Sequence, residues 1–485
     1  MSITKYKSCI SQYLKTRENV VKEEIQCAIG YNLELNEKEN IVNEYLMKHK
    51  YKELDEGFLD PQNFLAGNHF FKVKDKVENS KVFEFIKKIP KGASLHSHDT
   101  AMASGEYLYS ITFRDNLYGC AKDNGWTMQF FQEPPSSNWK LLSQLRTSGT
   151  FENFLKSKLT LVCDNPEVKY PNLNTVWTTF QNLFINLEKL ICYKPIFKEY
   201  FYQALKETYE DNVKYIEFRG YLPTVYDLDG TEYGPCEVVG MYIEVEKQFK
   251  QDYPDFFGCK FIFGPHRMVD NVVMDNYVKI YKEIKTQYPE FVIGFDLVGQ
   301  EDLGYPFTSF LPQLLEMKEF GCKFFFHAGE THWNGQSTDQ NLVDAILLDT
   351  VRLGHAFALL KHPVLAKIVK EKGIAVEVCP ISNQALKLID DLRSHPASIL
   401  IANNYPVVIG CDDPTFFGTK GISYDWYVTF MAICHRDSDL RLLKQLAINS
   451  LDYSALGVEE KERAKQQWQD EWKTFINTFY IHKIL

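Results

Sequence analysis

The stretch SLHSHDT, residues 94–100, places two histidines one residue apart and an aspartate directly after them. Residues i and i+2 of a strand point to the same face, so His96 and His98 would direct two imidazoles at one point. A metal ion is the usual reason for such an arrangement, although two incidental histidines at a strand end would give the same pattern. The rest of the chain has to decide between these two interpretations.

Further histidines and acidic residues close apolar runs elsewhere in the chain. They are His327, His355, Asp412 and Asp413, and Glu330 follows three residues after the first of them. Any one of these histidines is more often structural than a ligand, and Asp413 before a proline could begin a turn. Four histidines and two adjacent aspartates at the ends of such runs together favour one shared site.

The residue types suit a mononuclear metal hydrolase. Zn²⁺ accepts three imidazoles and one carboxylate because it is borderline-soft and imposes little geometric preference. The candidate ligands are His96, His98, His327 and Asp412. Zinc lowers the pKa of a bound water from about 16 towards roughly 7, which provides a hydroxide at neutral pH. The chain contains neither C-x-x-C nor H-x-E, which argues against a zinc site of the cytidine-deaminase type.

The remaining polar residues suit the proton and substrate chemistry around such a metal. His355 could take the proton of the water or steady the hydroxide, and both roles stay open. Glu330 could carry a proton to the leaving side of the substrate, a step worth on the order of 10²–10⁴ in rate. Asp413 could hold the substrate by a hydrogen bond. His362 and His395 each precede a proline and are expected in loops near helix starts.

Eight short apolar runs alternate with longer amphipathic stretches. They are residues 94–98, 215–219, 260–263, 292–297, 323–327, 350–355, 374–379 and 407–413. Such near-continuous apolar runs are typical of parallel strands buried on both faces. Eight strand–helix units predict an α/β fold, a (β/α)₈ barrel of the TIM type, whose catalytic residues lie at the carboxyl ends of the strands. The polar residues that close the runs fall at those ends.

The alternation of apolar runs and amphipathic stretches also predicts the domain organisation. Residues 1–85 show helical spacing of apolar residues and predict a helical extension outside the catalytic domain, which covers 86–485. The gap after the first run is far longer than one helix requires. Its turn residues, aromatics and Pro-Pro pair predict an inserted subdomain at about 113–175, on the face of the active site.

Composition and charge indicate which classes of partner and which cellular compartment to expect. The net charge is −10 without a long basic run, and no apolar run approaches 18 residues, so we expect neither a nucleic-acid nor a membrane partner. The amino-terminal stretch has no apolar signal region, no N-x-S/T sequon occurs, and the eleven cysteines are scattered without close pairs. Together these features favour a reducing, intracellular compartment.

Seven stretches, in order from about residue 90 to 420, carry a family resemblance. They are PKGASLHSHDT, NTVWTTF, GFDLVGQED, FFHAGET, RLGHAFAL, VEVCPISNQALKLIDDLRSHPA and DDPTFFG. With them the chain resembles the adenosine deaminase superfamily, and within it the adenosine deaminase growth factor branch, also called type 2 adenosine deaminase. The resemblance implies a metal-dependent hydrolase barrel that converts adenosine, and 2′-deoxyadenosine as well, to inosine-type products and ammonia.

The resemblance also implies a role for each site residue. It implies that His96, His98, His327 and Asp412 bind one Zn²⁺ per chain, that Glu330 protonates purine N1, that His355 is the partner of the zinc-bound water, and that Asp413 meets N7. It further implies substrate contacts from Asp99, Trp177, His266 and Gly299, although Trp177 could instead be a packing aromatic. The branch implies a homodimer whose interface includes the amino-terminal helices.

Two questions stay open after the resemblance. The branch is typically secreted, with a signal peptide, glycosylation and a disulfide in the insert, whereas here Cys120 has no evident partner nearby. We therefore expect a cytoplasmic member, with secretion as the alternative. A binding or growth-factor protein with weak catalysis on the same scaffold is a second possibility. A third is a deaminase of free adenine, a methylated adenosine or an adenosine phosphate, the last of which would call for a basic cluster at the mouth of the site.

Overall fold

The structure is a computed structural model, which describes residues 3–122, 125–147 and 149–484. Eight parallel strands form the centre of the main body, in two sheets of order β1-β5-β8-β9 and β10-β11-β12-β13. They are β1 Gly92–Ser94, β5 Val213–Gly220, β8 Gly258–Phe263, β9 Val292–Phe295, β10 His327–Ala328, β11 Arg352–His355, β12 Ala375–Val378 and β13 Val407–Ile409. Isolated parallel bridges join the sheets at both edges, between Phe295 and Phe324 and between Ser97 and Asp412. The predicted (β/α)₈ barrel is confirmed.

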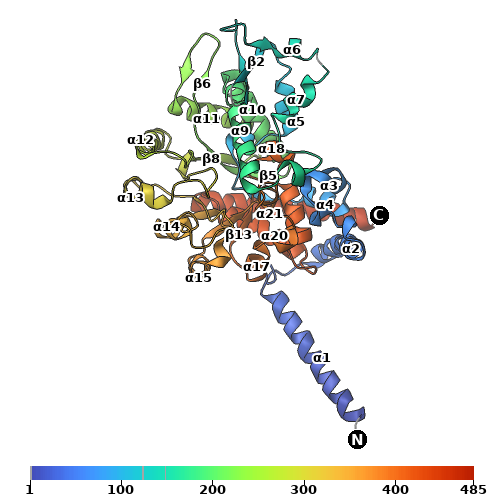
Figure 1. The fold of residues 1–485 in the computed structure, drawn as a ribbon. Helices are drawn as coiled ribbons and strands as arrows, with labels where there is room; N and C mark the ends of the chain where they lie inside the picture. The colour runs from blue at the N-terminus through green and yellow to red at the C-terminus, as the bar shows by residue number, and fades with distance from the viewer. Residues whose placement is uncertain (1–2, 123–124, 148, 485) are drawn as a thin grey trace.

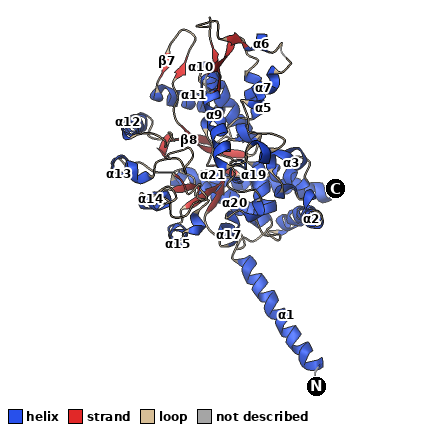
Figure 2. Ribbon diagram, viewed as in Figure 1, coloured by secondary structure: helices blue, strands red, loops and turns tan. Residues whose placement is uncertain are grey.

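Helices surround the strands on the outside of the barrel (Figure 2). They are α10 Lys194–Glu210, α11 Pro235–Asp252, α12 Asn271–Gln287, α13 Leu311–Glu319, α14 Asn341–Leu347, α15 Pro363–Lys372, α17 Ala397–Ala402 and α20 Leu440–Asp452. Local signals set their ends: the Asp270 carboxylate accepts the N–H of Val273 at the start of α12, and Gly373 ends α15 in the left-handed region at φ 67°. Every residue of β9, β11, β12 and β13 is buried, as expected for strands covered on both faces.

Four helices precede the barrel: α1 Ile3–Gln26, α2 Glu37–Leu59, α3 Phe70–Val77 and α4 Lys81–Lys88. A capping box of Asn36 and Glu39 begins α2, which packs against the carboxyl-terminal helix α21 Val458–Ile484. By contrast, α1 extends away from the body as a single straight helix (Figure 1). The proposed boundary at residue 85 lies inside α4.

A separate lobe lies between β1 and β5, at the top of Figure 1. An antiparallel sheet of order β3-β2-β4 is its centre, formed by β2 Leu117–Lys122, β3 Gly125–Phe130 and β4 Lys140–Leu141. Short helices follow and precede it: α5 Gly105–Ile111, α6 Leu142–Leu145, α7 Phe151–Ser157 and α8 Pro166–Lys169. Helix α9 Leu173–Ile191 packs against β3 and leads back to the barrel.

The remaining elements connect or cover the barrel strands. They are the β6 Val225–Tyr226 and β7 Glu232–Tyr233 hairpin, α16 Pro380–Ala385, α18 Pro414–Phe417, α19 Ser423–Val428 and a π-helical turn at Thr429–Ile433. No helix among the described residues is both long and apolar enough to cross a membrane.

The H-x-H stretch lies just past the regular part of its strand. The apolar run predicted a strand over 94–98, yet β1 ends at Ser94. The chain nevertheless stays extended, because the His98 N–H donates to the Asp412 carbonyl and the Asp412 N–H donates to the His96 carbonyl, both at 3.2 Å. The same bonds hold the chain beyond β1 beside the chain beyond β13.

Candidate metal and substrate site

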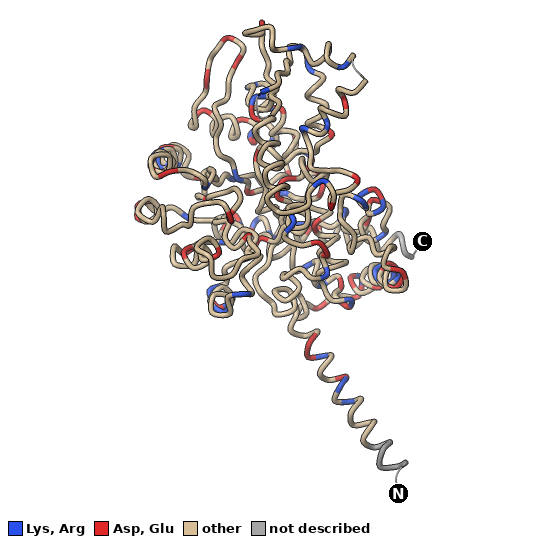
Figure 3. Tube along the Cα trace, viewed as in Figure 1, with Lys and Arg blue, Asp and Glu red and all other residues tan. Residues whose placement is uncertain are grey.

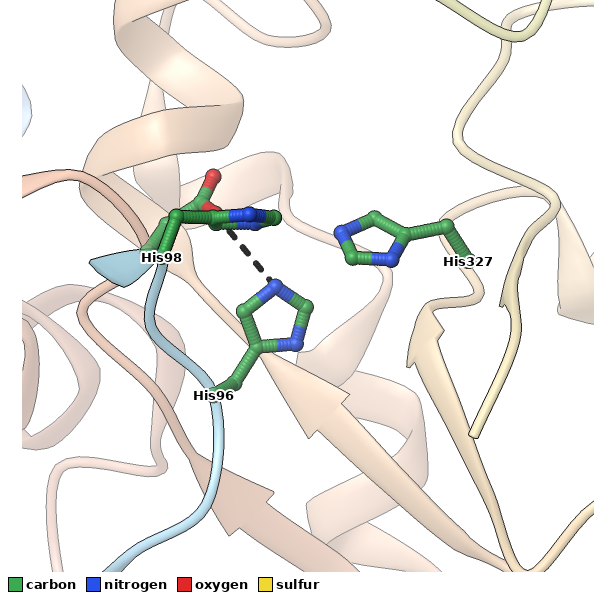
Figure 4. Close-up of side chains that lie close together, drawn as sticks. His96, His98 and His327 are labelled. Atoms are coloured by element: carbon green, nitrogen blue, oxygen red, sulfur yellow. Dashed lines mark ion pairs between the residues drawn. The ribbon is translucent and has the colours of Figure 1, made fainter. Parts of the chain in front are cut away.

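Three histidines and an aspartate from three places in the chain meet at the carboxyl ends of the strands. One potential ligand atom from each of His96, His98, His327 and Asp412 lies within 4.8 Å of the others. The Nε2 atoms of His96 and His98 lie 3.3 and 3.0 Å from Asp412 Oδ1. Figure 4 shows the three imidazole rings turned toward a common space.

The donor set fits a cation in that space. His96 Nε2 and Asp412 Oδ1 are both buried and have no hydrogen-bond partner. Burying such atoms without a partner is costly, and a metal ion would satisfy both. Burial raises the pKa of Asp412, but the adjacent imidazoles of His96 and His98 outweigh it and hold that pKa well below its usual range. An ionised carboxylate among imidazoles is a ligand set that Zn²⁺ accepts.

A layer of buried charged residues holds two of the rings from behind. His96 Nδ1 lies 2.6 Å from a Glu377 oxygen, and His327 Nδ1 lies 2.6 Å from an Asp296 oxygen. Arg219 joins the two carboxylates, with bonds of 2.7 Å to Asp296 and 2.5 Å to Glu377. Binding each ring through Nδ1 leaves its Nε2 directed into the site, which is how outer residues orient metal-binding histidines.

This layer of charged residues was not predicted from the sequence. Arg219, Asp296 and Glu377 lie inside the runs YIEFR, VIGFDL and IAVEVC and are completely buried. A charged residue within a strand that is otherwise apolar was the available signal. Lys, Glu, Arg and Asp are almost never fully buried unless they are paired, so such positions predict partners inside the barrel.

A cavity of about 430 Å³ opens beside the candidate metal ligands, between the strand ends and α9. Its lining includes ten of the eleven residues expected in the site: His98, Asp99, Trp177, His266, Gly299, His327, Glu330, His355, Asp412 and Asp413. The eleventh, His96, is fully buried and contacts the others through its ring. The tertiary fold therefore gathers all eleven residues in one place.

Two carboxyl groups face the cavity in conditions that favour their neutral form. The pKa of Glu330 is raised well above its usual value by burial and by the charges of Asp412 and Glu301. Burial, followed by the charge of Asp412, likewise raises the pKa of Asp413. Glu330 Oε1 and Asp413 Oδ1 are buried without a hydrogen-bond partner. A protonated carboxyl group can donate a hydrogen bond to a ligand at each position.

Glu301 fixes the backbone that carries Glu330. Its carboxylate accepts the N–H groups of Gly329 at 3.1 Å and Glu330 at 2.6 Å, and the Asn341 side chain donates to it at 2.9 Å. Arg267 Nη1 lies 3.6 Å from the same carboxylate. The loop after β10 is therefore held from outside the cavity.

The expected substrate contacts also line the cavity. Asp99 accepts a hydrogen bond from the Tyr242 hydroxyl at 2.6 Å, and burial raises the pKa of Asp99 to about 6. Gly299 has φ +100°, and a side chain there would place Cβ 2.5 Å from His266 Nε2. Trp177 is 4% exposed and packs edge-on against a phenylalanine of α9, so it is both a lining residue and a packing aromatic.

The His355 ring lies between Asp412 of the cavity lining and Asn383 behind it. Its φ of 58° places it in the left-handed region, its Nε2 lies 3.8 Å from Asp412 Oδ2, and its Nδ1 lies 3.1 Å from the Asn383 amide nitrogen. Asn383 in turn contacts His395. His395 precedes α17 and His362 begins α15, as expected for residues near helix starts, but His395 is also almost completely buried.

Two family models match this chain. The adenosine deaminase model matches residues 163–470, and the adenosine/AMP deaminase N-terminal model matches residues 2–86. Together they cover most of the sequence. The chain belongs to the adenosine deaminase family. The barrel, the buried carboxyl groups and the gathered histidines described above are thus features of an enzyme of this family.

Individual members of the adenosine deaminase family match over nearly the whole chain. It is 43% identical to adenosine deaminase of Aedes albopictus, over 95% of this chain and 87% of that one. It is 41% identical to adenosine deaminase 2 of Homo sapiens, over 95% and 93%. Among solved structures, an amidohydrolase of Burkholderia ambifaria with bound Zn shares the fold at a TM-score of 0.59 and 17% identity, over 82% of this chain and 94% of that one.

Proposed function

We propose that this chain is a zinc-dependent adenosine deaminase, which hydrolyses adenosine and 2′-deoxyadenosine to the corresponding inosines and ammonia. The observation that carries the proposal is the meeting of three histidines and Asp412 beside a cavity that also presents the buried carboxyl group of Glu330. The relatives named adenosine deaminase in Aedes albopictus and adenosine deaminase 2 in Homo sapiens support the substrate. The zinc-containing amidohydrolase of the same fold supports the metal.

The residues of the cavity have separate tasks in this reaction. Zn²⁺ held by the three histidines and Asp412 would activate the water that attacks C6 of the purine. Purine N1 and N7 are hydrogen-bond acceptors, so each requires a donor from the protein. The raised pKa values of Glu330 and Asp413 favour the protonated form of both carboxyl groups, which suits Glu330 as the donor to N1 and Asp413 as the donor to N7.

The cavity favours a nucleoside over a nucleotide. Recognition of a phosphate group usually requires arginine or lysine. Among the residues that the structure describes, no lysine or arginine lines the cavity, whereas Glu188 of α9 does. A carboxylate at this position repels a phosphate. We therefore infer that adenosine and 2′-deoxyadenosine are better substrates than adenosine monophosphate.

The direct test follows the loss of the 6-amino group by ultraviolet absorbance with zinc-loaded protein. Adenosine, 2′-deoxyadenosine, adenosine monophosphate, N6-methyladenosine and adenine are compared in parallel. Glu330→Gln should keep its zinc content and lose about 10²–10⁴-fold in kcat, because the amide cannot supply the proton. Glu371→Gln is the control, since Glu371 lies on the surface of α15, where it pairs with Lys367 at 3.7 Å.

The same assay separates the enzyme from a binding protein on this scaffold. If the wild type contains one zinc per chain and converts none of the five compounds, catalysis is vestigial and the proposal fails. If Glu330→Gln retains most of the wild-type rate, the chain is a deaminase but the role of Glu330 is wrong.

We further propose that the chain forms a homodimer through α1. This helix extends away from the body in Figure 1, and Figure 3 shows both signs of charge along it. Ile10, Tyr13 and Leu14 are each more than half exposed on it. Light scattering should give twice the chain mass for the wild type, and Ile10→Asp with Leu14→Asp should give the monomer mass. A monomeric wild type would refute this proposal.

We also propose that the protein is cytoplasmic. All eleven cysteines are free thiols, including Cys120 in the lobe between β1 and β5. Several buried free thiols are typical of proteins in a reducing compartment. Immunoblotting of fractionated cells and of the medium tests this, and accumulation of the protein in the medium would favour the secreted alternative.

A further inference from the structure

We propose that Asn383 and His395 are positioning residues that fix the ring hydrogen of His355 on Nε2, so that neutral His355 donates a hydrogen bond to the attacking water. The inference rests on the proposed deaminase function, which it deepens. It decides between the two roles that the sequence left open for His355, because a ring nitrogen that carries a hydrogen cannot accept the proton of the water.

The backbone at Ala397 fixes the direction of the first hydrogen bond in this series. The backbone N–H of Ala397 can only donate, and it lies 3.0 Å from Nδ1 of His395. Nδ1 of His395 must therefore be the acceptor, without a hydrogen. Burial lowers the pKa of His395 to about 3, so the ring is neutral at pH 7 and its one hydrogen is on Nε2.

The orientation of the Asn383 side chain follows from this tautomer. His395 Nε2 lies 2.9 Å from Asn383 Oδ1, and the amide oxygen accepts its hydrogen. The amide nitrogen of Asn383 is then on the other side, 3.1 Å from Nδ1 of His355. An amide nitrogen only donates, so Nδ1 of His355 is an acceptor. Each bond in this series fixes the direction of the next.

Neutral His355 consequently has its hydrogen on Nε2. That atom lies 3.8 Å from Asp412 Oδ2, on the side of the cavity where the candidate metal ligands meet. His355 is 3% exposed, which restricts movement of its ring. The N–H therefore points toward the space where the water must be activated, as a hydrogen-bond donor.

The positioning role of Asn383 and His395 can be tested without substituting a residue that lines the cavity. Neither Asn383 nor His395 lines it, and both are almost completely buried behind His355. Glutamine and methionine have nearly the same length and shape, but only glutamine can donate a hydrogen bond from the position of His395 Nε2. His395→Gln therefore keeps a donor to the Asn383 side chain and His395→Met removes it, while both variants lose the contact with Ala397.

We expect His395→Gln to keep kcat within a few-fold of the wild type. His395→Met should lose about 10–100-fold in kcat, the usual effect of removing an outer hydrogen-bond partner. KM for adenosine and the zinc content should change little in both variants, because the cavity walls are unchanged. Equal kcat values for the two variants would overturn the inference.

A spectroscopic readout tests the tautomer without relying on activity. Nitrogen-15 chemical shifts of the imidazoles distinguish protonated from unprotonated ring nitrogens in protein labelled at its twelve histidines. The His355 signals are assigned by their loss in His355→Gln. The zinc-loaded and metal-free wild type should both show protonated Nε2 and unprotonated Nδ1 at His355. The reverse pattern would refute the inference, and this test does not require that the His395 variants fold.

Failure of the inference is distinguishable from failure of the proposed function. A zinc-loaded wild type that leaves adenosine unchanged refutes the deaminase. An active wild type with the Nδ1–H tautomer at His355 leaves the deaminase intact and refutes the role of Asn383 and His395.

Discussion

Glu377 provides a quantitative test of the charged layer beneath the candidate metal site. Its two carboxylate oxygens accept from three buried donors: Arg219 at 2.5 Å, Arg352 at 2.6 Å and His96 at 2.6 Å. Glu377→Gln replaces one oxygen by an NH₂ group of similar size. At least one of the three donors then faces the new NH₂ group, which is itself a donor. The two buried arginines also lose one of the negative charges that pair with them.

The size of the effect follows from the burial. All four side chains are completely buried, and breaking a buried charge pair costs about 3–5 kcal/mol. The entropy of unfolding is about 2.1 cal/mol/K per residue, so the 485 residues of this chain correspond to about 1 kcal/mol per degree at the midpoint. Glu377→Gln should therefore lower Tm by about 3–5 °C. Because Glu377 also orients His96, zinc affinity should fall about 10–100-fold.

Calorimetry of the metal-free protein measures the first effect, and competition with a chelator measures the second. Glu371→Gln is the matched control, because it makes the same chemical change in an exposed i,i+4 pair with Lys367, which is worth less than about 1 kcal/mol. A Tm for Glu377→Gln within 1 °C of the control would refute the view that this layer stabilises the barrel.

Three further predictions concern the cavity. Free Zn²⁺ at about 1,000 times its Kd should stabilise the folded metal-free protein by ~4 kcal/mol and so raise its Tm by about 4 °C in calorimetry. His98→Ala should lose most of that shift, and an equal shift would exclude His98 as a ligand. Gly299→Ala should raise KM for adenosine in steady-state assays, because its Cβ would lie 2.5 Å from His266 Nε2 at a φ of +100°; an unchanged KM would contradict this contact. The raised pKa of Glu330 keeps it protonated to higher pH, so kcat/KM should be full below that pKa and fall above it, and a pH profile without an alkaline decline would count against Glu330 as the proton donor.

The fold was predictable because the strand pattern is local. All eight runs overlap strands of the barrel, for example VVIGCDD with β13 and KFIF with β8, since buried parallel strands are apolar along their whole length. The first run was placed too late, because SLHSH begins where β1 ends. The extended backbone of His96 and His98 depends on bonds to Asp412, which lies more than 300 residues away and leaves no local signal.

The residues that line the candidate site were predictable from the sequence, whereas the charged residues behind them were not. Polar residues that follow apolar strands lie together whenever the strands are parallel and adjacent, so His327, His355 and Asp412 could be grouped from order alone. The charges beneath them could not be paired in advance. Arg219 and Glu377 are 158 positions apart, and nothing in either neighbourhood specifies the other.

The sequence by itself determined the eight strands and helices, the types of the candidate metal and substrate residues, and their common edge, because these follow from periodicity and from chemistry at fixed positions along the chain. Only the tertiary structure decided which donor meets which acceptor. The direction of the hydrogen bonds from Ala397 through His395 and Asn383 to His355, and the absence of basic residues from the described cavity lining, depend on side chains that packing brings together. Hydrogen bonds act over about 3 Å in space, at any separation in sequence.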